Sequence, residues 1–158
     1  MPQDGRPTLE IVRQKIRHYC AYQERCHSEV ETKLRELGVF GDTASEIISG
    51  LISEGFLNEE RFACAFAGGK FRQLNCGRVF IRQHLKRKGL NDYLIRKGLA
   101  AIDEQDYRRC IQRLAERELA RAKGNALQRR QHTLRFLMRT GFETHLIDEI
   151  HSGPGDFS

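Results

Sequence analysis

Three segments of the sequence share a spacing in which a leucine precedes a glycine by four positions. They are Leu34–Gly38, Leu85–Gly89 and Leu137–Gly141, and their glycines lie 51 and 52 residues apart. An apolar residue follows each glycine, and a short apolar helical pattern comes after it. Glycine just beyond the last apolar residue of a helix is typical of a left-handed helix stop. The repeat therefore predicts three related helical units in tandem.

The interior of the chain is free of proline over the 146 residues between Pro7 and Pro154. This favours an all-helical chain, because proline breaks the interior of a helix. Around each leucine–glycine segment, apolar residues recur every three or four positions, as in amphipathic helices. The patterns at 28–31 and 43–46, Ser-x-x-Glu and Thr-x-x-Glu, fit capping boxes at helix starts. The expected helices span residues 9–23, 28–37, 43–53, 58–73, 76–88, 92–101, 104–122, 126–140 and 143–150.

We expect an all-α fold in which three tandem three-helix units stack into an elongated, curved molecule. A unit of roughly 50 residues buries little core alone, so that neighbouring units must pack together. The expected division is a flexible tail at 1–8, units at 9–56, 57–102 and 103–151, and a flexible tail at 152–158. The alternative is an irregular single-domain bundle in which the glycine spacing is fortuitous.

The formal net charge of +6 is concentrated in the middle unit. Residues 57–102 carry 10 basic and 3 acidic side chains, whereas residues 1–56 carry 7 and 9, and residues 103–158 carry 10 and 9. A concentration of like charge is costly in self-repulsion, and it indicates a polyanionic or acidic partner.

Within the middle unit, the helix expected at 76–88 has a row of cations. Arg78, Arg82 and Lys86 are four positions apart and share one face. Arg78 falls in the first turn, where a cation opposes the helix dipole, so helix stability does not explain it. The alternative is a solvated face whose last-turn cations complement the dipole. The candidate residues for binding a phosphate backbone or an acidic protein groove are Lys70, Arg72, Arg78, Arg82, Lys86, Arg87, Lys88, Arg96 and Lys97.

We expect this surface to recognise shape and phosphate groups rather than bases. The sequence has no homeodomain, zinc-finger or basic-zipper signature, and no aromatic-rich strand on which bases could stack.

The sequence offers little for catalysis or metal binding. Its five cysteines include no Cys-x-x-Cys pair and are expected to be small buried or half-buried thiols in a reducing compartment. The strongest metal candidate, formed by His18, Cys20, Cys26 and His27, matches no common zinc spacing. The segment 68–70, Gly-Gly-Lys, lacks the spacing of a phosphate-binding loop. We therefore expect a protein that is not an enzyme and that uses no cofactor or metal.

No apolar run approaches the roughly 18 residues that a membrane span needs. The first residues are polar and do not resemble a secretory signal. We expect a cytoplasmic protein without membrane contact.

The stretch Gly55–Ala63, read as Gly-Phe-Leu-Asn-Glu-Glu-Arg-Phe-Ala, resembles a hallmark segment of the RecX regulatory proteins of bacteria. Gly77–Leu90 is similar to the segment that follows it in that family. Ser28–Leu34 and Arg135–Phe142 resemble the signatures of its first and last units, so that the resemblance covers about residues 9–150. The chain departs from the common pattern at 68–69 and 75–76, where the family often has a polar, basic linker.

The resemblance implies a three-unit helical protein that modulates the RecA recombinase. Members of this family bind in the groove of the RecA–single-stranded DNA filament and lower ATP hydrolysis, strand exchange and co-protease activity, which affects DNA repair, recombination and the SOS response. The partners that it implies are the RecA filament and single-stranded DNA, bound directly or within the filament, with weak duplex binding and a monomeric state. One alternative is a helical DNA-binding regulator that acts independently of RecA, and another is a helical-repeat adaptor for an acidic protein.

Overall fold

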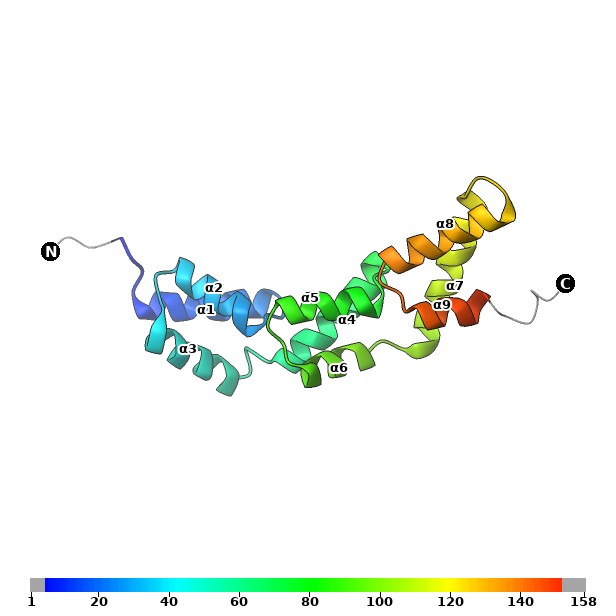
Figure 1. Cartoon of the computed structure of the whole chain (residues 1–158). Coiled ribbons are helices and arrows are strands. Elements are labelled where there is room, and N and C mark those ends of the chain that lie inside the picture. The colour runs from blue at the N-terminus through cyan, green and yellow to red at the C-terminus, as the bar shows by residue number, and fades with distance from the viewer. Residues whose placement is uncertain (1–4, 152–158) are drawn as a thin grey trace.

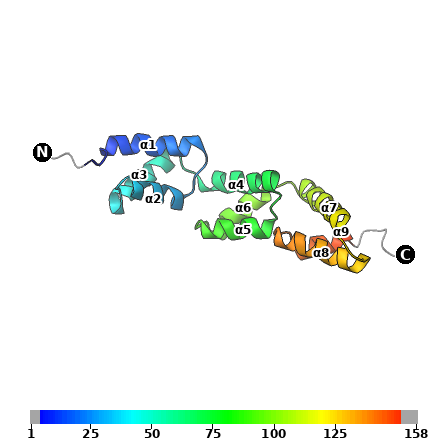
Figure 2. The same ribbon diagram turned by 90° about the horizontal axis from the view of Figure 1, so that it is seen from above.

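The computed structural model describes residues 5–151, which form nine α-helices and no β-strand over that range (Figure 1). The helices follow one another in three groups of three along an elongated, curved molecule (Figures 1 and 2). This confirms the predicted fold class, and each helix begins and ends within two residues of its expected limits. The helices are α1 (Leu9–Tyr22), α2 (His27–Glu36), α3 (Gly41–Ser53), α4 (Glu59–Leu74), α5 (Arg78–Arg87), α6 (Asp92–Ala100), α7 (Glu104–Arg121), α8 (Ala126–Arg139) and α9 (Thr144–His151).

The leucine–glycine repeat ends the middle helix of each group. Gly38, Gly89 and Gly141 have φ angles of 82°, 89° and 95°, in the left-handed region. The residue after each glycine donates its backbone N–H to the carbonyl oxygen of the repeat leucine, over 2.8, 3.2 and 3.1 Å respectively. This hydrogen bond satisfies a carbonyl that the helix leaves free, and it folds the following apolar side chain back onto the last turn. The repeat is thus a helix-terminating motif used three times.

The two capping boxes expected at 28–31 and 43–46 are wrong. The α2 helix starts earlier, and Glu29 accepts a hydrogen bond from the backbone N–H of the N-cap residue Cys26 at 3.1 Å. The α3 helix starts at Gly41, and no side chain caps it. Both patterns begin in the first turn and end in the second, so they have the spacing of a capping box without its position at the N-cap.

The buried apolar residues form two cores. Helices α1 to α3 enclose one, which includes Ile16, Leu34 and Leu51. Helices α4 to α9 enclose a second, continuous core, in which Tyr107 of α7 lies 5.6 Å from the ring of Phe71 and 5.5 Å from that of Phe142. Because the second and third groups share this core, the packing does not separate residues 57–102 from 103–151, and the unit limits stay predictions.

Cys20, Cys26 and Cys110 are buried thiols, and Cys64 and Cys76 are half-buried, as expected. Between residues 5 and 151, no helix is both long enough and apolar enough to cross a membrane. No three metal-ligating side chains gather in that same range. The flexible tails expected at 1–8 and 152–158 lie outside the described residues, except for residues 5–8.

Candidate functional site

The middle helices of the second and third groups meet end to end, with the carboxyl end of α8 against the amino end of α5 (Figure 2). The backbone N–H groups of Gly77 and Val79 donate to the carbonyl oxygens of Thr140 at 2.9 Å and Gly141 at 3.0 Å. A Cβ atom on Gly77 would lie 2.2 Å from the carbonyl group of Gly141, so the approach requires glycine. Free donors of one helix thus satisfy free acceptors of the other, and the two helix dipoles point the same way.

The same arrangement recurs between the first and second groups. The Ser28 hydroxyl, in the first turn of α2, donates to the carbonyl oxygen of Lys88 at the end of α5, over 2.8 Å. The Lys88 ammonium lies 3.4 Å from the Glu29 carboxylate, and Cys26 is fully buried against the core of α4 to α9. Helices α8, α5 and α2 therefore follow one another in one direction along the molecule (Figure 1).

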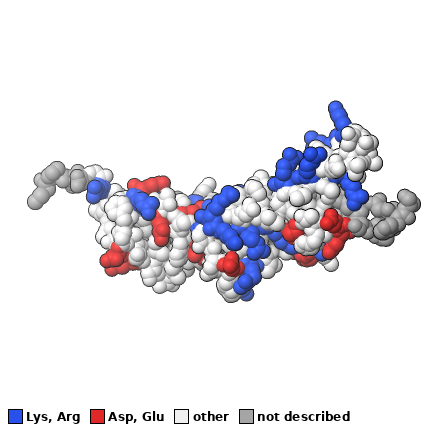
Figure 3. Space-filling view, in the orientation of Figure 1, with Lys and Arg blue, Asp and Glu red and all other residues white. Residues whose placement is uncertain are grey.

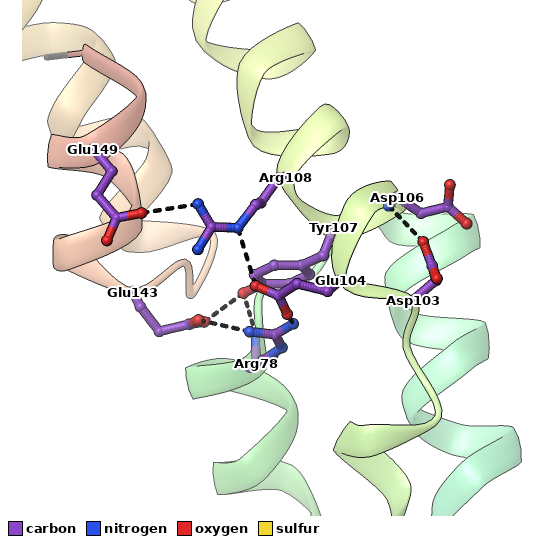
Figure 4. Close-up of polar contacts among 8 residues, drawn as sticks. All are labelled: Arg78, Asp103, Glu104, Asp106, Tyr107, Arg108, Glu143 and Glu149. Carbon is purple, nitrogen blue, oxygen red and sulfur yellow. Dashed lines mark hydrogen bonds and ion pairs between the residues drawn. The ribbon is translucent and has the colours of Figure 1, made fainter. Parts of the chain in front are cut away.

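Arg78, the first residue of α5, is committed to contacts inside the protein (Figure 4). Its guanidinium donates to the carboxylates of Glu104 and, over 3.2 Å, of Glu143, and it lies 3.8 Å from the centre of the Tyr107 ring. Its backbone N–H donates to the Tyr107 hydroxyl at 2.9 Å, and that hydroxyl donates to Glu143. The side chain of Arg78 is only 21% exposed. The network joins α5 to the start of α7 and to the turn before α9.

Hydrogen bonds and burial in this network shift the pKa values of Glu104 and Tyr107. The hydrogen bond from Arg78, helped by Arg108, holds the pKa of the Glu104 carboxyl below its ordinary value, although partial burial opposes the shift. Burial raises the pKa of the Tyr107 hydroxyl, and the hydrogen bond to Glu143 adds to this effect. The raised pKa keeps the Tyr107 hydroxyl protonated, so that it remains the hydrogen-bond donor to Glu143.

These contacts explain the cation in the first turn of α5 without a bound polyanion. The unfavourable position of Arg78 relative to the helix dipole is outweighed by two carboxylates, Glu104 at the start of α7 and Glu143 in the turn before α9. The charge of Arg78 is therefore already neutralised inside the protein, and Arg78 is not one of the exposed cations.

The other predicted binding residues fall into two classes by exposure. Lys70 and Lys88 are half-buried, and their ammonium groups lie 5.4 and 5.6 Å from the centre of the Phe66 ring. The rest are exposed and take part in no ion pair within residues 5–151. These exposed cations are Arg72, Arg82, Lys86, Arg87, Arg96 and Lys97.

In the space-filling view, Lys and Arg side chains gather over α5 and α6, at the middle of the molecule (Figure 3). They gather again along α8, whereas Asp and Glu on this face lie mostly over the first group and toward α7 and α9, with some acidic surface also at the start of α6 (Figure 3). The structure therefore brings the cations of α5 and α6 together and adds those of a third helix.

The cations of α8 were missed in the sequence. This helix has four arginines and no acidic residue. Arg129 donates to the carbonyl oxygen of Leu119 at 2.8 Å, and Arg130, Arg135 and Arg139 are exposed, with no ion pair in the part of the chain described. The acidic residues of α7 and α9 cancel these charges when residues 103–158 are counted together. A count made helix by helix would have found them.

Comparison with known proteins gives one consistent family. The model of the second three-helix domain of RecX matches residues 58–99, which correspond to α4 to α6. The regulatory protein RecX of Pseudomonas savastanoi pv. phaseolicola is 29% identical over 150 residues, which cover 94% of each chain. That of Bacillus cytotoxicus is 28% identical over 130 residues, which cover 82% of this chain and 48% of the relative. The chain thus spans about half the length of several curated relatives that it matches.

The fold matches as well. The crystal structure of RecX from Lactobacillus salivarius superposes with a TM-score of 0.83 at 26% sequence identity, and the match covers 90% of this chain and 94% of that one.

Proposed function

Because this chain belongs to the RecX family of regulatory proteins, we propose that it binds the RecA–single-stranded DNA filament and inhibits RecA. The observation that carries the proposal is the pair of acid-free helices α5 and α8, which lie end to end. Together with α6 they present exposed cations without internal partners along an elongated molecule. A phosphate backbone is a regular row of negative charges, and such a surface is suited to it.

The elongated shape suggests how inhibition would arise. A rigid molecule that lies along a helical groove contacts several neighbouring subunits, so it opposes both the addition of subunits and their movements. We therefore propose lower ATP hydrolysis, strand exchange and co-protease activity of RecA, with consequences for recombination, DNA repair and the SOS response. In this proposal the protein is a cytoplasmic monomer that acts by binding alone, without enzymatic activity or a cofactor.

The test follows ATP hydrolysis by RecA on single-stranded DNA as the protein is added. We expect hydrolysis to fall at stoichiometric protein. A variant with Arg82→Glu and Lys86→Glu on α5, and another with Arg135→Glu and Arg139→Glu on α8, should each lose most of the inhibition. Both pairs are exposed and unpaired in the described chain, so helicity by circular dichroism should not change.

The matched control reverses two exposed cations outside this surface, with Arg13→Glu and Lys15→Glu on α1. It changes the net charge by the same amount and should inhibit like the original protein. Unchanged hydrolysis and filament length with the original protein would contradict the proposal. Sequence-selective duplex binding without any effect on RecA would indicate instead a regulator that acts independently of RecA.

A further inference from the structure

A row of aromatic rings crosses from α4 to α5 on the middle group of helices. Phe80 and His84 lie one turn apart on α5, with ring centres 4.5 Å apart, and the Phe66 ring of α4 follows at 6.2 Å from His84. Phe80 is 38% exposed although it is a large apolar side chain. The backbone next to Phe80 is fixed, because the N–H of the preceding residue, Val79, donates to the carbonyl oxygen of Gly141. The row is therefore a fixed aromatic surface open to solvent at one end.

Cations lie near two of these rings, Phe66 and His84. The ammonium groups of Lys70 and Lys88 lie over the Phe66 ring, at 5.4 and 5.6 Å. Burial lowers the pKa of His84, and the positive charges of Arg87, Lys70 and Lys88 lower it further. The imidazole is therefore a neutral ring at neutral pH, with three cations near it.

One carboxylate lies at the edge of this cluster. Glu29 of α2 pairs with Lys88 at 3.4 Å, whereas Lys70 and Arg87 have no ion pair within residues 5–151. The cluster thus retains net positive charge beside its rings.

Rings that are exposed next to unpaired cations are the combination used to bind single-stranded nucleic acid. Unpaired bases stack on the rings, and the cations bind the phosphates. Duplex DNA does not offer its base faces to such a surface, and an acidic peptide would need only the cations. Among polyanions, the exposed Phe80 ring at the end of this row therefore favours a single strand.

We propose that Phe80 and His84, flanked by Lys70 and Arg87, form a stacking platform for unpaired bases of single-stranded DNA. The inference rests on the proposed function and deepens it, because it adds direct contact with bases to the expected contact with phosphates. It differs from the phosphate-only recognition expected from the sequence, where Phe66 and Phe80 are too far apart to suggest one surface.

The experiment measures direct binding without RecA, by fluorescence anisotropy. One probe is labelled oligothymidine, and the other is an abasic oligonucleotide with the same number of phosphates. The protein should bind oligothymidine at least about 5-fold more tightly, the lower limit for one stacked base. Equal affinity for the two probes would overturn the proposal.

Two variants locate the effect. Phe80→Leu keeps an apolar side chain but removes the ring, and His84→Ala removes the neighbouring ring. Each should lower the preference for oligothymidine and leave the affinity for the abasic probe unchanged. The control, Tyr22→Ala, removes a ring that is 77% exposed on α1 and should keep the full preference. A preference that survives in both Phe80→Leu and His84→Ala would overturn the proposal.

A competition experiment tests the remaining alternative, in which the surface binds an acidic protein. If oligoglutamate displaced oligothymidine as effectively as unlabelled oligothymidine does, the surface would belong to an acidic protein and the proposal would be wrong. Because these measurements contain no RecA, their result is independent of the ATP hydrolysis assay. If the protein showed no preference for oligothymidine, the proposal of RecA inhibition would be unaffected. If the protein did not inhibit RecA, the proposal of base stacking would be unaffected.

Discussion

Replacing Arg78 by methionine should weaken the joint between the second and third groups of helices. The substitution keeps much of the aliphatic length and removes the guanidinium. Glu143, whose side chain is only 17% exposed, would then keep the Tyr107 hydroxyl as its partner and lose its cation. Glu104 would keep Arg108. The main cost is therefore the partly buried charge of Glu143.

The size of this cost follows from the exposure of the pair. Removal of one partner from a fully buried ion pair costs about 3–5 kcal/mol, whereas exposed pairs contribute about 0–1 kcal/mol. Arg78 and Glu143 are 21% and 17% exposed, so we expect a loss of about 2 kcal/mol in the free energy of unfolding. For a chain of this size, that lowers Tm by about 4–8 °C.

Thermal and urea unfolding followed by far-ultraviolet circular dichroism measure the loss. The matched control is Arg82→Met, one turn along the same helix, where the arginine is exposed and has no ion pair in the described chain. It should change the free energy of unfolding by less than about 0.5 kcal/mol. If Arg78→Met were no more destabilising than Arg82→Met, the assignment of Arg78 to the joint would be refuted.

Two further predictions concern the packing of α4 on α6 and the acid stability of the joint. Gly98→Ala would place a Cβ atom 2.7 Å from the carbonyl oxygen of Ala63, so it should destabilise the protein by about 1–3 kcal/mol in urea unfolding, whereas Gly50→Ala, with open space around its Cβ, should not. Arg78 lowers the pKa of Glu104 in the folded state, so the ionised Glu104 carboxylate stabilises the folded protein above its ordinary pKa of 4.5. This stabilisation is lost as the pH falls through the lowered pKa. Urea midpoints should therefore fall less on acidification from about pH 5 to pH 3 in Glu104→Gln than in the original protein; an equal fall would contradict this origin of acid sensitivity.

The helices and their ends could be predicted because the forces that form them act over a few residues. Apolar periodicity, the absence of proline and the spacing from Leu85 to Gly89 all act within one or two turns, and they placed each helix within two residues of its observed limits. The two predicted capping boxes were wrong because the same spacing also occurs within a helix, one position after its start in α2 and two after it in α3. The Ser28 hydroxyl instead donates to the carbonyl oxygen of Lys88, at the end of α5.

The candidate site was predicted less completely, because charge was counted over whole units. The count located the exposed cations of α5 and α6 but averaged those of α8 with the carboxylates of its neighbours. A cation is neutralised by a carboxylate that lies close to it in the folded structure, whatever their separation in the sequence. Charge totals for a unit therefore say little about which of its cations stay free.

Arg78 shows this difference most clearly. Its position at the start of α5 follows from sequence, but its partners Glu104, Tyr107 and Glu143 lie 26, 29 and 65 positions away. The rings of Phe66 and Phe80 likewise come from two helices that meet only in the folded chain. Local chemistry decided where helices form, since a helix bonds within itself. Tertiary packing decided which of their side chains are neutralised and which remain free to bind, because those contacts join residues that the sequence keeps apart.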